Sequence, residues 1–247
     1  MRPNLSNQTA ERQAPPPGAG AFALVLALTA VGNVLAHVVA RPLYVPVNLL
    51  VAAAAVLVAL GPGRCTLADL GLARRDLGGG LRWGGAVAAV VAAAIAAGGL
   101  LPSTRPWFAD RRVNADATWL LLYTIVLRIP LGTVVLEETL FRGVLLGIGL
   151  RRWSPWRATA FASVLFGLWH VLPASGLAAN PATAGLATSG GGGRAATIAF
   201  AVVSTALVGA AWCWLRLRAR SLLAPALVHL AANSLGYLAA WLVLRSH

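Results

Sequence analysis

The sequence predicts an all-α protein that crosses a membrane repeatedly, as a bundle of about seven to eight transmembrane helices. Of its 247 residues, 58% are hydrophobic and only 11% are charged, whereas about a quarter of the residues in a soluble domain are charged. Apolar runs of about 20 residues recur along the chain, and a helix of about that length spans a bilayer. The lipid bilayer is therefore the first partner that the sequence predicts.

Seven apolar runs account for the spans, and the fourth is longer than the rest. At 1.5 Å per residue, residues 119–149 would form a helix of about 46 Å, too long for one upright crossing. Pro130 is expected to kink or break this helix, so an eighth crossing or a re-entrant piece stays open. The seven runs are 20–39, 45–60, 81–101, 119–149, 157–173, 195–215 and 221–244.

The remaining segments are polar or rich in small residues. Residues 1–19 are polar and then proline-rich, which predicts a disordered cytoplasmic tail. Residues 63–76 (GRCTLADLGLARRD) are amphipathic and are expected at the membrane interface. Residues 174–194 have the composition of a flexible linker. Residues 38–40 (VVA) resemble a signal-peptidase site, so a cleaved first run stays an alternative.

The net charge of +13 comes entirely from arginine, mostly in short clusters between the apolar runs. This is the pattern of cytoplasmic loops. Without a nucleic-acid motif or a basic helix face, we predict no nucleic-acid partner. Abundant Ala and Gly beside Arg without Lys indicate a GC-rich genome, and we therefore expect a bacterial plasma membrane.

The arginines between the runs and at their ends also predict the orientation. With seven spans, twelve lie on the side of the amino terminus and six on the other, which favours a cytoplasmic amino terminus. The first side carries Arg2, Arg12, Arg64, Arg74, Arg75, Arg82, Arg151, Arg152, Arg157, Arg216, Arg218 and Arg220, and the second carries Arg41, Arg105, Arg111, Arg112, Arg194 and Arg245.

Three ionisable residues stand inside the fourth run, in VVLEETLFRGVLL (134–146). Each charge at the bilayer centre costs about 2.5–3.5 kcal/mol on insertion scales, so such residues usually face a bundle interior or a wet cavity. Glu138 and Arg142 are four residues apart, which places them on one helix face as an ion pair. A purely structural role explains this pair, but it leaves Glu137 without an obvious partner.

Two histidines in other spans complete the candidate site. His170 ends FGLWH, with Phe166 one helical turn earlier, and His229 opens HLAAN, with Asn233 one turn later. A single histidine in a membrane span more often bonds a neighbouring helix. Together with the embedded acidic pair, however, these residues predict a central polar cavity. The other two histidines are assigned no role.

Carboxylate, imidazole and amide groups together suit the hydrolysis of an amide bond. A carboxylate beside an imidazole can deprotonate a water molecule, and a second imidazole with an amide can stabilise an oxyanion. Glutamate and histidine could equally hold a zinc ion with an open position. Serine chemistry is less favoured, because GxSxG and SxxK are absent, and the absence of HExxH excludes an ordinary zincin. Neither Cys65 nor Cys213 lies in a motif.

Three motifs in order resemble those of one family. EETLFR resembles EExxxR, FGLWH resembles FxxxH, and HLAAN resembles HxxxN of the CPBP intramembrane proteases. This family of CAAX proteases and bacteriocin-processing proteins, formerly called Abi, includes the type II CAAX prenyl endopeptidases. The resemblance covers about residues 115–240. It divides the chain into amino-terminal transmembrane helices (20–115) and a CPBP-like catalytic transmembrane core (116–247), after the tail.

The resemblance also implies a role for each motif residue. Glu137 would activate water with the help of His170, and His229 and Asn233 would stabilise the oxyanion. Glu138, Arg142 and Phe166 would support the site. Two mechanisms stay open: zinc held by Glu137, His170 and His229, or a glutamate mechanism without metal. The implied substrate is a membrane-associated or lipidated protein or peptide.

Two alternatives to an intramembrane endopeptidase belong to other classes. A non-catalytic scaffold or a bacteriocin self-immunity protein could retain the fold, but would not need an embedded Glu137. A proton-coupled transporter could use the same acids and histidines as a relay. It would be expected to show matched repeats with broken helices, and the sequence has no such symmetry.

Overall fold

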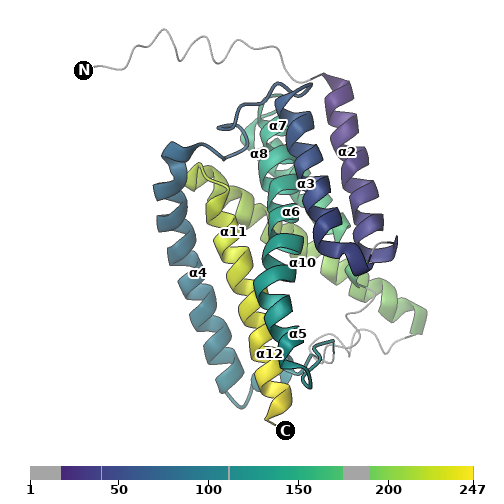
Figure 1. Cartoon of the computed structure of the whole chain (residues 1–247), viewed down its shortest axis with the longest axis vertical. Helices are drawn as coiled ribbons and strands as arrows, with labels where there is room; N and C mark the ends of the chain where they lie inside the picture. Colours follow the sequence, from purple (N-terminus) through teal and green to yellow (C-terminus); the bar gives the residue numbers. More distant parts are fainter. Residues whose placement is uncertain (1–17, 40, 111, 175–189, 247) are drawn as a thin grey trace.

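The computed structural model describes residues 18–39, 41–110, 112–174 and 190–246, and within them every long element is a helix (Figure 1). The prediction of an all-α fold is confirmed. The described residues form seven helices, some of them divided by π-helical turns: α2 with η1 (Ala19–Val34, Leu35–Val39), α3 (Tyr44–Leu60), α4 (Leu77–Leu100), α5 through α7 (Thr118–Leu150), α8 (Pro155–Trp169), α10 (Gly190–Ala219), and α11 through α12 (Leu223–Arg245).

Five of these helices are long and apolar enough to cross a membrane, which makes the chain an integral membrane protein. The other two fall below that length: α3 has 17 residues and α8 has 15. The five are Ala19–Val39, Arg74–Leu100, Thr118–Leu150, Gly193–Ala219 and Leu223–Arg245.

The long fourth helix is continuous, so a break at Pro130 and a crossing hidden in this run are both wrong, while the kink that was the other expectation at Pro130 stays a prediction. Thr118–Leu150 contains Pro130 within a π-helical segment, η5 (Thr124–Val134), and a second such segment, η6, covers Glu138–Leu145. Wider π-helical turns, in which bonds run from residue i to i+5, let the helix accommodate a proline. The helix that carries the acidic pair is thus one element.

One of the segments between the runs differs from expectation, and the interfacial location expected for another stays a prediction. The glycine-rich end of the linker predicted at 174–194 is helical, because α10 begins at Gly190, while residues 175–189 lie outside the described residues. The amphipathic segment 63–76 consists mainly of turns and ends in a short 3-10 helix. Residues 1–17 of the predicted tail, and Ala40 of the cleavage-site alternative, also lie outside the described residues.

Glycines let neighbouring helices approach closely. A Cβ on Gly167 of α8 would lie 2.5 Å from the carbonyl oxygen of Val202 on α10, and one on Gly84 of α4 would lie 2.7 Å from Ala224 on α11. Small residues at such contacts allow backbone-to-backbone packing in membranes. They bring α8 against α10 and α4 against α11, around the central α5–α7 helix (Figure 1).

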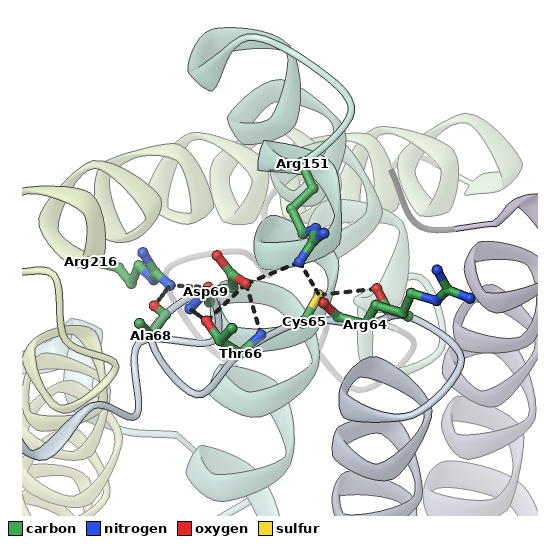
Figure 2. A network of polar contacts seen from close by, with 8 residues as sticks. Arg64, Cys65, Thr66, Ala68, Asp69, Arg151 and Arg216 are labelled. Carbon is green, nitrogen blue, oxygen red and sulfur yellow. Dashed lines mark hydrogen bonds and ion pairs between the residues drawn. The ribbon is translucent and has the colours of Figure 1, made fainter. Parts of the chain in front are cut away.

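Two arginines hold the loop between α3 and α4 against the end of the bundle (Figure 2). Arg151 donates to the carbonyl oxygen of Arg64 and lies 3.4 Å from the carboxylate of Asp69. Arg216, which is buried, donates to the main-chain oxygens of Ala68 and Asp69. These contacts fix the loop to the ends of α7 and α10.

Cys65 in this loop is expected to be unreactive. Burial, with a smaller contribution from Asp69, raises the pKa of its thiol from 9.0 to about 11. Because the thiolate is the nucleophile, alkylation at pH 8 should be about a hundredfold slower than for a free thiol and should accelerate as the pH rises toward 11. The measurement is iodoacetamide labelling of Cys213→Ala protein, with the protein unfolded in detergent as control. Equal folded and unfolded rates would contradict it.

Candidate active site

One face of the fourth helix carries a buried ion pair and a second buried acid. Glu137, Glu138 and Arg142 retain 5%, 1% and 0% of their exposure. Nη1 of Arg142 donates to Oε1 of Glu138 at 3.2 Å, as the spacing of four residues leads one to expect. Buried charges are costly unless they are paired, so this cluster must be held by its neighbours.

Aromatic rings complete the environment of Arg142. Its guanidinium carbon lies 3.9 Å from the ring centre of Phe166 on α8 and 4.9 Å from that of Trp212 on α10. The negative faces of these rings attract the cation. Three helices thus converge on one guanidinium, and the predicted supporting residue Phe166 lies against it.

His229 of α11 links the two acids. Its Nδ1 lies 2.8 Å from Oε1 of Glu138, and its Nε2 lies 3.8 Å from Oε2 of Glu137. An ionised carboxylate only accepts hydrogen bonds, so Nδ1 carries the proton in the shorter contact. The ring of Trp212 lies against the imidazole at 4.5 Å between centres, with the two planes tilted by 40°. Glu137, Glu138, Arg142 and His229 therefore form one buried polar cluster.

Trp169 forms a hydrogen bond with Glu137, the acid that does not take part in the ion pair with Arg142. Its indole Nε1 donates to Oε1 of Glu137 at 3.0 Å, and both side chains are buried. Oε2 of Glu137 accepts no hydrogen bond from the described residues. One oxygen of the carboxylate is thus fixed in position, and the other is available to a reactant.

His170 lies where α8 ends, as that helix's C-cap residue. Its Nδ1 lies 2.7 Å from the carbonyl oxygen of Phe166, and its ring meets the Phe166 ring edge-on. Since a carbonyl only accepts, Nδ1 carries the proton and Nε2 presents a lone pair. Within the described residues no hydrogen bond or ion pair joins His170 to Glu137.

Asn233 lies one turn beyond His229, in the π-helical turn η8 (Ala231–Leu235), and is half-buried. It does not contact the acidic cluster through any hydrogen bond within the described residues. It lines instead a cavity of about 440 Å³ between η5, the last helix and the loop before α5. The structure thus brings together four of the seven predicted residues, with Phe166 against them and His170 and Asn233 beside them.

The predicted zinc ligands are not grouped as a metal ion requires. In the described ranges of the chain, no three His, Cys, Asp or Glu side chains lie close enough together to hold one. His229 directs its nitrogens to Glu138 and Glu137, whereas the recorded contacts of His170 are with Phe166. Within the described residues, Glu137, His170 and His229 thus do not form a group of three metal ligands.

The first helix also reaches the site, which the sequence did not predict. Nδ2 of Asn33 donates to the carbonyl oxygen of Trp169 at 3.1 Å. The ring of His37, to which we assigned no role, lies 5.7 Å from the Trp169 ring, edge-on. The tryptophan that fixes Glu137 is therefore itself held by α2 and η1.

Two further functional residues were missed, Trp169 and Trp212. A signal for Trp169 existed: it directly precedes His170, and an indole N–H in an apolar span needs an acceptor. Trp212 had no such signal, because only the packing of α10 against α8 and α11 places its ring on His229 and Arg142.

A helical integral membrane protein whose interior holds two acids, an arginine and a histidine belongs to the class of membrane proteins with a buried, ionisable reaction or transport site. Residues 114–235, which contain every predicted site residue, match the family described as type II CAAX prenyl endopeptidase, Rce1-like. These residues therefore form an Rce1-like domain of the type II CAAX prenyl endopeptidases, which are membrane proteases of the CPBP family. Searches of curated proteins and of solved structures found no match.

Proposed function

We propose that the protein is an intramembrane endopeptidase that hydrolyses peptide bonds of membrane-associated or lipidated proteins or peptides. The observation that carries the proposal is the geometry of Glu137. This carboxylate is 5% exposed, its Oε1 is held by Trp169, and its Oε2 lies 3.8 Å from His229. A base fixed in this way, with one oxygen available, is suited to take a proton from water.

The reaction begins at that oxygen. Oε2 of Glu137 accepts a hydrogen bond from a water molecule and removes its proton, while Nε2 of His170 accepts the other hydrogen and orients the water. The hydroxide forms a bond to the carbonyl carbon of the substrate, and the C=O electron pair moves to oxygen. Glu137 then delivers its proton to the amide nitrogen, and the oxyanion's electron pair re-forms the C=O bond as the C–N bond breaks. The new carboxylic acid gives its remaining proton to the amine, so the products are a carboxylate and an ammonium group.

His229 and Asn233 stabilise the oxyanion in this proposal. Nε2 of His229, which lies 3.8 Å from Oε2 of Glu137, is the donor when it carries a proton. The side-chain amide of Asn233, one turn further along the helix, supplies the second donor. The cavity that Asn233 lines would bring the substrate to the central polar site.

Glu138 and Arg142 act on His229 and not on substrate. Glu138 Oε1 accepts from both Arg142 and His229, which fixes the orientation of the imidazole ring. Arg142 compensates one of the two negative charges of the acidic pair. Such support holds reacting groups in a productive geometry.

We also propose that all seven helices cross a bacterial plasma membrane, with the amino terminus in the cytoplasm. The twelve-to-six distribution of arginines supports this orientation. α3 and α8 are short for a membrane crossing. Chain beyond the ends of such a helix can still lie at membrane depth if it is surrounded by protein and not by lipid. Tagging the loop at 61–73 and testing its accessibility in intact cells checks the orientation.

A cleavage assay tests the function. Purified protein in liposomes is mixed with a library of membrane-anchored and prenylated reporter peptides, and the products are read by mass spectrometry. Cleavage by the wild-type protein and not by the Glu137→Gln variant supports the endopeptidase. Binding of reporters without cleavage by the wild-type protein would favour the scaffold or immunity alternative.

Chelation tests the two forms of the mechanism. We expect cleavage to persist in excess EDTA, because the three predicted ligands are not grouped for zinc in the described residues. The measurement is the rate of reporter cleavage before and after dialysis against chelator, with a known zinc protease as the control. Loss of activity that added zinc restores would establish the zinc-dependent form instead.

A further inference from the structure

Arg128 is a membrane-helix cation that the catalytic proposal does not use. It lies in η5 of the helix Thr118–Leu150 and is exposed. Within the described residues no carboxylate lies at ion-pair distance from it; its recorded contact is with the ring of Tyr44, at 4.4 Å. Ionisable residues at such positions are costly and commonly mark a substrate or ion site.

The guanidinium of Arg128 is held in place without being neutralised. The Tyr44 ring attracts the cation through its face but carries no charge. Tyr44 is in turn fixed, because its hydroxyl and that of Thr133 lie 3.1 Å apart. Nearby, Asn48 donates to the carbonyl oxygen of Gly132 at 2.8 Å, which ties α3 to the same helix. This arrangement pre-organises a positive charge for a ligand.

Arg128 faces the same cavity as the proposed oxyanion residue Asn233. The cavity, of about 440 Å³, is lined by charged residues and by the aromatic side chains of Trp107, Phe108 and Tyr237. Its second cation, Arg112, pairs with Asp110 at 2.9 and 3.0 Å from Nε, whereas no ion pair joins Arg128 to a carboxylate in the described part of the chain.

The distance along the helix between Arg128 and Glu137 relates the charge of Arg128 to the bond that is cleaved. Arg128 precedes Glu137 by nine residues of one continuous helix, which is about 13 Å along a helix axis. An extended peptide covers that distance with about four residues, since each residue rises about 3.3 Å. A group bound at Arg128 would thus lie about four residues from the bond that Glu137 attacks.

We propose that Arg128 and this cavity form a subsite for a carboxylate of the substrate, about four residues from the cleaved bond. Planar guanidinium groups bind carboxylates through two parallel hydrogen bonds. The carboxylate is either an acidic side chain or the end of the peptide chain, because both present the same group. The inference rests on the proposed function, since it takes the peptide to be the substrate.

Binding measured without cleavage tests the subsite by itself. Glu137→Gln protein in phosphatidylcholine nanodiscs is titrated against fluorescein-labelled, palmitoylated short peptides of Ala and Leu, and the Kd is read by fluorescence anisotropy. Three peptides differ in one group: a terminal carboxylate, a terminal amide, or a terminal amide with one internal Glu. We expect one carboxylate peptide to bind about tenfold or more tightly than the plain amide. Tighter binding of the terminal-carboxylate peptide would identify the end of the chain as the ligand, and tighter binding of the internal-Glu peptide would identify an acidic side chain.

Two variants assign the preference to the cavity. Arg128→Gln, added to Glu137→Gln, should abolish the preference. Arg245→Gln should keep it, because this exposed arginine at the same end of the bundle contacts Thr118 and Trp241 and does not line the cavity. Equal binding of all three peptides, no binding, or a preference that survives Arg128→Gln would overturn the subsite.

The same peptides separate this proposal from the catalytic one. They are also incubated with protein that retains Glu137. A carboxylate preference without cleavage would count against the endopeptidase and leave the subsite standing. Cleavage without any preference would support the endopeptidase and overturn the subsite.

Discussion

Replacement of Glu137 by Gln is expected to lower kcat for reporter cleavage by about 10²–10⁴-fold, the usual contribution of a general base. The amide keeps the shape of the side chain and can still accept the hydrogen bond from Trp169 at Oε1. It cannot take a proton from water. Because substrate is bound elsewhere, KM should change little, which is the kinetic pattern of an interaction made in the transition state.

The matched control for this variant is Asp116→Asn. Asp116 is exposed near the start of the same helix, so the substitution removes a carboxylate of the chain outside the site. Its kcat and KM should equal those of the wild-type protein. Thermal unfolding of both variants in detergent verifies that they are folded. If Glu137→Gln retained full kcat, the base would have to be another group and the proposed mechanism would be wrong.

The sequence predicted the helices well because their signal is local. Apolar runs report burial in lipid directly, and Gly167 and Gly84 occur where helices touch. The spacing of four residues was enough to predict the Glu138–Arg142 pair. The predicted break at Pro130 and the predicted linker end at Gly190 were wrong because both rested on local helix propensity. Proline and glycine reduce that propensity, yet both segments are helical in the structure.

The contacts between helices could not be predicted in the same way. The sequence placed His170 and His229 on their faces but gave no distance between the faces. In the structure His229, and not His170, contacts the acids, and Trp169 occupies the position beside Glu137. Such pairings depend on helix rotation and crossing, which a sequence pattern of one helix does not determine. The participation of Asn33 was hidden for the same reason.

Replacement of Arg142 by Met is expected to lower the free energy of unfolding by about 3–5 kcal/mol, the usual cost of removing one partner of a buried ion pair. Arg142 has no exposed surface, and its loss would leave the carboxylate of Glu138 buried with only His229 beside it. The flexible Met side chain fills much of the volume against Phe166 and Trp212, so loss of charge and not a cavity should dominate. The measurement is equilibrium unfolding in mixed detergent micelles.

A double substitution separates the lost charge pair from lost packing. If the cost comes from an uncompensated carboxylate, the double variant Glu138→Gln/Arg142→Met should be more stable than Arg142→Met alone. Glu138→Gln removes the negative charge that Arg142→Met leaves without its cation. Additive losses would instead assign the cost to packing. Arg157→Met, at an exposed position on α8, should stay within about 0.5 kcal/mol of wild type. An equally stable Arg142→Met would mean that the buried acids do not need this cation, and His229 would then be the group that compensates them.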